Sequence, residues 1–219
     1  MSVLIILMAI LFSSVGVRVV DGRKVQKKKQ TIVIDSGHGG IDSGKVSVLG
    51  DYEKDINLSI AKRLEKILKK AGYNVVMTRK SDEGLYSESS TGKKSEDMRK
   101  RCAIIDSSDA VAAISIHQNS YHEENVKGAQ VFFYKNSEDG KQLAECLQES
   151  LVNELDKTNI RQAKSNDSYY ILRKTQTPTV IVECAFLSNY EEAALIIEED
   201  YQNKVAKAIL SGLKNYLEQ

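Results

Sequence analysis

The chain has 219 residues, a length that suits one domain with a sizeable core. Hydrophobic residues make up 42% and charged residues 28% of the chain, which excludes fibrous and disordered classes. The net charge of +1 argues against a dedicated nucleic-acid surface, which would need a strong basic excess, so no nucleic-acid partner is expected.

The N-terminal segment differs from the rest of the chain. Residues 3–17 are almost entirely apolar. This stretch is too short for a comfortable membrane-spanning helix of about 20 residues but typical of a signal-peptide core. No basic residue precedes it and no Ala-x-Ala cleavage site follows it. We therefore interpret residues 1–20 as a signal peptide or an N-terminal membrane anchor, and 21–30 as a basic tether. The domain would be exported and act outside the cytoplasm, secreted or associated with the membrane.

From residue 31 to 219, strand-like and helix-like segments alternate, which predicts one α/β domain. We expect a twisted, mostly parallel central sheet with helices on both faces. Strands are expected at 31–36, 73–78, 111–117, 127–134, 169–172 and 179–183, and helices at 53–71, 96–107, 137–155, 190–198 and 201–217. Asp51 is expected to cap the first of these helices. The polar residues 80–95 are expected to form a mobile loop near the mouth of the site.

The cysteines do not indicate a disulfide framework. There are three, Cys102, Cys146 and Cys184, and no Cys-x-x-Cys pair occurs. We expect Cys102 and Cys146 to be buried apolar positions on helices. In a strand, the side chain of Cys184 would point away from that of Glu183, so we expect it to be buried too.

Two of the three histidines end apolar runs that are typical of buried strands. The first run is followed by His38 within a Gly-rich turn, the second ends at His117, and a third ends at Glu183. In open α/β sheets, ligands gather outside the carboxyl ends of the strands. We expect His122, by contrast, to be a surface loop residue.

A catalytic zinc commonly takes three protein ligands from His and Asp/Glu and keeps a fourth position open. His38 and His117 are two natural ligands, and Glu53 is well placed to be the third. The residues alone do not separate Glu53 from four competing carboxylates, which are Asp35, Asp42, Asp51 and Asp55.

Four segments carry a resemblance to a known family. In chain order they are 34–44 (IDSGHGGIDSG), 53–58 (EKDINL), 115–120 (SIHQNS) and 182–189 (VECAFLSN). Together they resemble the zinc-dependent N-acetylmuramoyl-L-alanine amidases of the bacterial cell wall (amidase type 3), and most of all the germination-specific, spore-cortex branch. The pattern departs from the family at Asp106, Gln118 and Ala185, where Asn, Ala and Gly are usual.

The resemblance implies an activity and a set of roles. His38, Glu53 and His117 would bind one Zn²⁺, and Glu183 would be the catalytic carboxylate that takes a proton from water and delivers it to the leaving nitrogen. The reaction would hydrolyse the amide between the lactyl group of N-acetylmuramic acid and L-alanine in peptidoglycan. The expected partners are glycan strands with their stem peptides, and an activator or accessory protein.

Arg173 is a further candidate, because a guanidinium could hold a substrate carboxylate or stabilise the oxyanion. A solvated arginine is an equally good interpretation.

Two other functions compete with the amidase. A zinc carboxypeptidase acting on wall peptides would share the two-His, one-Glu set, but that class uses a close His-x-x-Glu pair and Ile41 stands three residues after His38. A catalytically weak or inactive wall-binding or morphogenetic protein would keep the fold, and Ala185 beside Glu183 is the feature that favours it.

Overall fold

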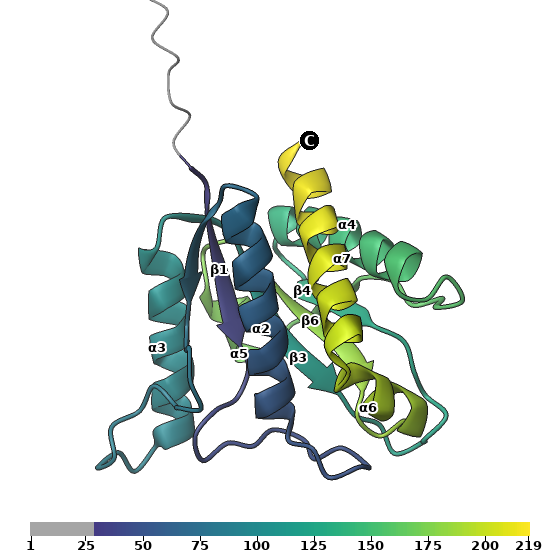
Figure 1. Ribbon diagram of the computed structural model, residues 1–219. Coiled ribbons are helices and arrows are strands. Elements are labelled where there is room, and N and C mark those ends of the chain that lie inside the picture. The colour runs from purple at the N-terminus through teal and green to yellow at the C-terminus, as the bar shows by residue number, and fades with distance from the viewer. Residues whose placement is uncertain (1–28) are drawn as a thin grey trace, which may run out of the picture.

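The computed structural model describes residues 29–219, which form a six-stranded sheet flanked by helices (Figure 1). The strands are β1 (Thr31–Ser36), β2 (Asn74–Met77), β3 (Ala110–Asn119), β4 (Gln130–Tyr134), β5 (Lys164–Asn166) and β6 (Thr179–Phe186). The helices are α2 (Glu53–Lys70), α3 (Lys93–Ser107), α4 (Glu138–Glu154), α5 (Tyr170–Lys174), α6 (Tyr190–Ile196) and α7 (Glu199–Leu217).

The sheet has the strand order β2-β1-β3-β6-β4-β5 and is mostly parallel. Only the β4–β6 pairing is antiparallel. Because β1, β3 and β6 are adjacent and parallel, their carboxyl ends meet at one edge of the domain. This confirms the fold class expected from the alternating pattern.

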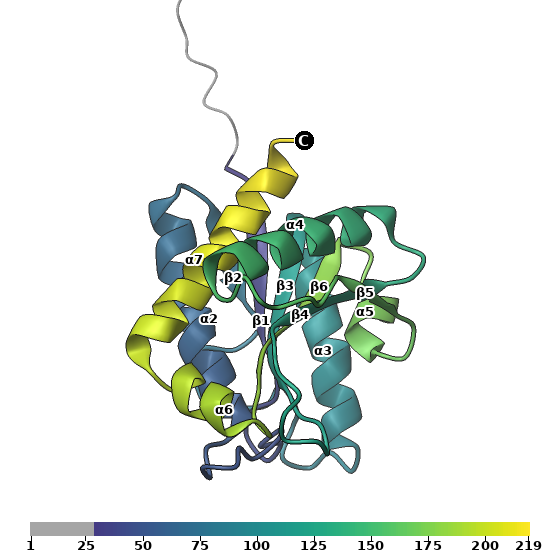
Figure 2. The same cartoon turned by 90° about the vertical axis from the view of Figure 1, so that its right-hand side faces the viewer.

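Helices cover both faces of the sheet, because alternate strand residues point to opposite sides. Ile32 and Ile34 of β1 pack with the apolar stripes of α2, α4 and α7, whereas Val33 packs with α3 and α5. Figure 2 shows α2 and α7 on one side of the strands and α3 and α5 on the other. In this part of the chain, no helix combines the length and apolarity needed to cross a bilayer.

The strand expected at 169–172 is wrong: these residues enter the short helix α5. Asn166 Oδ1 accepts hydrogen bonds from the backbone N–H groups of Ser168 and Tyr169, and this turn starts the helix despite the β-prone Tyr and Ile side chains. The preceding strand β5 is short and polar, so it has no alternating pattern that could have revealed it.

The expected Asp51 cap is also wrong. Tyr52 is the N-cap residue of α2 and provides no side-chain cap, while Asp51 accepts a hydrogen bond from the hydroxyl of Ser47. The loop expected at 80–95 ends earlier, because α3 already begins at Lys93. The signal peptide or anchor predicted for 1–20, and most of the tether predicted for 21–30, lie outside the described residues.

Candidate metal centre

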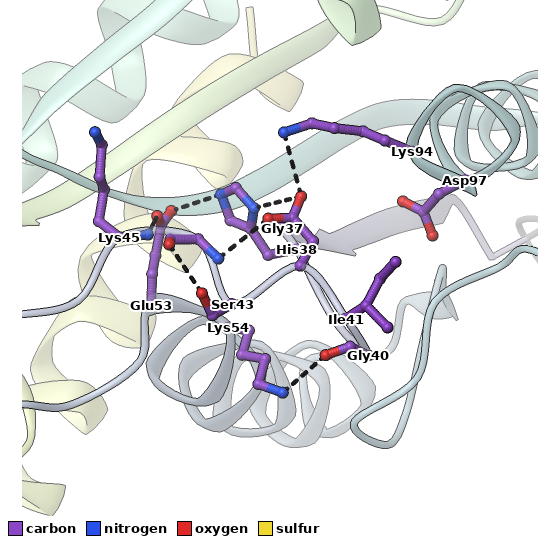
Figure 3. A network of polar contacts seen from close by, with 12 residues as sticks. Gly37, His38, Gly40, Ile41, Ser43, Lys45, Glu53, Lys54, Lys94 and Asp97 are labelled. Atoms are coloured by element: carbon purple, nitrogen blue, oxygen red, sulfur yellow. Dashed lines mark hydrogen bonds and ion pairs between the residues drawn. The ribbon is translucent and has the colours of Figure 1, made fainter. Parts of the chain in front are cut away.

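Three of the side chains singled out by sequence converge at the carboxyl edge of the sheet. His38 follows β1, His117 lies on β3, and Glu53 begins α2. Glu53 Oε1 lies 3.2 Å from His38 Nε2 and 3.0 Å from His117 Nδ1. The two imidazole centroids are 4.9 Å apart. Figure 3 shows Glu53 and His38 directed toward each other. Within residues 29–219, these three form the one cluster whose donor atoms, all within 4.8 Å of one another, could hold a metal ion.

Two glycines make this convergence sterically feasible. A Cβ at Gly37 would overlap the His117 ring, and a Cβ at Gly44 would come within 2.6 Å of Glu53 Oε2. Gly44 also has a φ of 68°, in the left-handed region that favours glycine. His38 itself adopts a φ of 61°, an unusual backbone conformation for a residue with a Cβ. Such strain persists where the surrounding structure holds it, and here it directs the imidazole toward Glu53.

The Glu53 carboxylate is buried and fixed by backbone donors. The N–H of Lys45 donates to Oε2 at 2.9 Å, and the N–H of Gln118 donates to Oε1 at 3.1 Å. The amide of Asn57, one helical turn after Glu53, reaches Oε1 at 3.4 Å and also donates to the carbonyl of Gly37. Gln118 Nε2 in turn donates to Asn57 Oδ1 at 3.1 Å. Gln118, one of the departures from the family pattern, is therefore part of the support of Glu53.

Asp42 approaches the other nitrogen of His38, with Oδ2 3.0 Å from Nδ1. The two groups are close enough for an ion pair, but the angle at His38 Nδ1 does not meet the geometry of a hydrogen bond. Burial disfavours charge on His38, but the Asp42 and Glu53 carboxylates outweigh it and raise the pKa of His38 to about 9. Burial likewise opposes ionisation of Glu53, yet His117 and His38 hold the pKa of Glu53 far below its usual range. The cluster thus favours positive charge beside Glu53.

This donor set fits a divalent metal such as zinc. Two imidazole nitrogens and one carboxylate are a ligand combination found in catalytic zinc sites. A carboxylate that contacts the second nitrogen of a liganding histidine, as Asp42 does, is a common supporting feature of such sites.

Two buried arginines hold the loop that carries His38, and the sequence reasoning did not find them. Arg79 donates to the carbonyls of Ser36, Gly37 and Lys54 at 2.9, 3.0 and 2.7 Å. Arg101 donates to the carbonyls of Ser36 and His38 at 2.7 and 2.6 Å. Both side chains are 2% exposed, and such burial of a charged side chain requires this many partners. Arg79 lies two residues after the end of β2, and its position after an apolar run was the one available signal.

Of the competing carboxylates, Asp35 and Asp51 have partners away from the cluster. Asp35 is buried, pairs with Arg101 at 2.8 Å, and accepts hydrogen bonds from Thr78 and Ser115. Burial opposes its ionisation, but the charge of Arg101 prevails and lowers the pKa of Asp35 to about 2. Asp51 accepts from Ser47, and neither it nor Asp55 joins the cluster.

Beside the cluster lies a cavity of about 610 Å³ that Glu183 also lines. Glu183 is paired in register with His117 on the neighbouring strand, so both side chains project from the same face of the sheet. Its Oε2 is buried without a hydrogen-bond partner among the described residues. Burial raises the pKa of Glu183 to about 7. A carboxyl group of this kind can both accept and return a proton near neutral pH.

The remaining candidates lie elsewhere. Arg173 is exposed on α5 and does not line the cavity, although Tyr169 and Tyr170 just before it do; its role stays a prediction. His122 is exposed in a loop, as expected. All three cysteines are free and buried, also as expected.

The relatives of this chain define its class. The sequence profile of the N-acetylmuramoyl-L-alanine amidases matches residues 32–215, and the chain belongs to this family. The chain is therefore a peptidoglycan amidase, which hydrolyses the bond between N-acetylmuramic acid and L-alanine.

Individual relatives refine this assignment. The chain is 38% identical over 189 residues to the germination-specific N-acetylmuramoyl-L-alanine amidase of Bacillus subtilis, an alignment that covers 84% of this chain and 78% of that protein. It superimposes with a TM-score of 0.84 and 40% identity on the CwlD amidase of Clostridioides difficile, solved in complex with the GerS lipoprotein, covering 87% of this chain and 99% of that one. An N-acetylmuramoyl-L-alanine amidase of Nostoc punctiforme matches with a TM-score of 0.76 and 32% identity, covering 87% and 98%.

Proposed function

We propose that this amidase is zinc-dependent, with His38, Glu53 and His117 as ligands and Glu183 as the catalytic carboxylate. The observation that carries the proposal is the approach of both imidazoles to one Glu53 oxygen, beside a cavity lined by a buried and unpartnered carboxylate. Bound zinc would supply Lewis acidity, which polarises an amide carbonyl and acidifies water.

The residues of the chain have separate tasks in this mechanism. Glu183 Oε2 accepts the proton of the attacking water and then delivers it to the departing L-alanine nitrogen. The raised pKa of Glu183 suits both steps, because its two protonation states have similar free energy near neutral pH. Asp42 orients the His38 ring, and the backbone N–H groups of Lys45 and Gln118 orient Glu53.

We further propose that the substrate is spore-cortex peptidoglycan, that the domain acts outside the cytoplasm, and that an accessory protein assists it. The name of the B. subtilis relative supports the first point. The lipoprotein complex of the C. difficile relative supports the last. The apolar segment at 3–17 supports export, as a cleaved signal peptide or a retained anchor.

Metal analysis combined with two variants tests the chemistry. The purified protein should hold about one zinc per chain, and His117→Ala should lose it. Glu183→Gln should keep the zinc but release no stem peptides with an intact N-terminal L-alanine from sacculi, as read by mass spectrometry. A fully active Glu183→Gln, or a His117→Ala that retains zinc, would contradict the assignment of roles.

A further inference from the structure

Two lysines flank the metal cluster, and their side chains have no role in the mechanism above. Lys45 lies in the loop before α2, and Lys94 lies in the first turn of α3. Both line the 610 Å³ cavity. Figure 3 shows their ammonium groups on the same side of His38 and Glu53, reached from two different elements.

The charge of Lys45 is not neutralised within the domain. Among residues 29–219, no ion pair engages its Nζ, and its backbone N–H is already used on Glu53. Lys94 lies 3.5 Å from Asp42, whose carboxylate also serves His38. A lysine exposed at a cavity mouth without an acidic partner is available to an anionic group of a bound molecule.

Another part of the lining is aromatic or apolar, beside polar side chains such as Asn119 and Ser120. Tyr169, Tyr170, Ile171, Ile181 and Met98 provide aromatic and apolar surface to the same cavity. A matching ligand would have an uncharged face, which packs on the aromatic and apolar side chains, and an anionic arm, which reaches the lysines. A muramoyl peptide has this composition, since its sugar and lactyl group are uncharged and its stem peptide can carry free carboxylates.

We propose that Lys45, aided by Lys94, binds the carboxylate of an acidic stem peptide and thereby sets the substrate preference of the enzyme. This inference rests on the proposed amidase site. The α-carboxylate of a glutamate at the second stem position lies about two residues, or roughly 7 Å, from the scissile carbonyl. The backbone N–H of Lys45 contacts the proposed ligand Glu53, so the side chain of Lys45 starts beside the metal cluster. Its flexible four-carbon stem can place the ammonium group at a distance from the cluster similar to that between the stem-peptide carboxylate and the scissile carbonyl.

The test compares two substrates that differ by one charge. Peptidoglycan strands are prepared with glutamate at the second stem position, or with the same position amidated to isoglutamine. The wild-type enzyme should cleave the acidic strands with a KM about fivefold lower, the effect expected of a solvent-exposed ion pair. The KM for the acidic strands should rise with salt, while the KM for amidated strands should change little.

The variant Lys45→Met removes the charge, keeps an unbranched side chain, and retains the backbone N–H that holds Glu53. It should raise the KM for acidic strands about fivefold more than the KM for amidated strands, so that the preference between the two substrates is lost. Lys45→Arg should restore the preference. Lys207→Ala, at an exposed position on α7 away from the cavity, serves as the control and should behave as wild type.

The outcomes separate the two proposals. Equal KM values of the wild-type enzyme for both substrates, or a Lys45→Met that affects both equally, would overturn charge recognition by Lys45 while leaving the amidase in place. A zinc-loaded wild-type enzyme that cleaves neither substrate would instead contradict the proposed function.

Discussion

The backbone of Gly37 lies directly against the imidazole of His117. A Cβ at position 37 would overlap Cε1 and Nε2 of that ring. The Gly-rich turn after β1 therefore does more than bend the chain: it provides the space in which a histidine from the neighbouring strand can turn toward Glu53.

Gly37→Ala should displace the His117 ring and lower activity by about 100-fold, since a misplacement of about 1 Å near reacting groups has an effect of this size. The zinc content of the purified protein should fall in parallel. Gly92→Ala is a suitable control, because a Cβ there meets no atom within 4 Å. Normal zinc content and activity in Gly37→Ala would show that the ring can move without consequence.

Asp42→Asn tests the support of His38. The substitution keeps the size of the side chain and an oxygen able to accept from the N–H of Gly44, but it removes the charge 3.0 Å from His38 Nδ1. Zinc affinity should fall by about 10- to 100-fold, as measured by competition with a chelator. An unchanged affinity would mean that Asp42 does not orient the ring.

Arg79→Lys should destabilise the domain even though the charge is kept. Lysine cannot reproduce the fork of donors that reaches the carbonyls of Ser36, Gly37 and Lys54 at the same time. The free energy of unfolding should fall by about 3 kcal/mol, as measured by urea denaturation. As a control, Lys80→Ala at the neighbouring exposed position should change the free energy of unfolding by less than about 0.5 kcal/mol. Equal stability of the two variants would refute this role of Arg79.

Asp35 makes stability depend on acid pH. Its folded pKa of about 2 lies below the ordinary value of 3.8, so its stabilising contribution is present above about pH 4 and is lost as the pH falls toward 2. The difference of almost two pKa units corresponds to about 2 kcal/mol. The stability gap between wild type and Asp35→Asn should therefore narrow by that amount from pH 5 to pH 2 in urea titrations. A gap independent of pH would contradict the lowered pKa.

The sequence predicted the fold class, and two of the strand-end side chains that it singled out do lie in one cluster, because both expectations depend on strong patterns. Apolar runs that end at His38, His117 and Glu183 place those residues at one sheet edge once the strands are parallel. The choice of Glu53 over four aspartates did not follow from the residues alone. That choice needed the family resemblance. The structure adds a reason to set Asp35 aside, because its carboxylate is paired with Arg101.

The supporting residues could not be predicted, because their partners are distant in sequence. Arg101 donates a hydrogen bond to the carbonyl of His38, 63 positions away in the sequence. The local sequence pattern of α3 does not predict this contact. The strand expected at 169–172 failed for a related reason: the turn formed by the Asn166 side chain overrode the intrinsic preference of the residues that follow.

The direction of β1 has a consequence for how the enzyme is presented to its polymer. β1 starts at the end of the domain that lies farthest from the metal cluster and runs toward it (Figure 1). The described chain therefore enters the domain on the side opposite the cluster. The first described residues leave clear the mouth through which a glycan strand must approach.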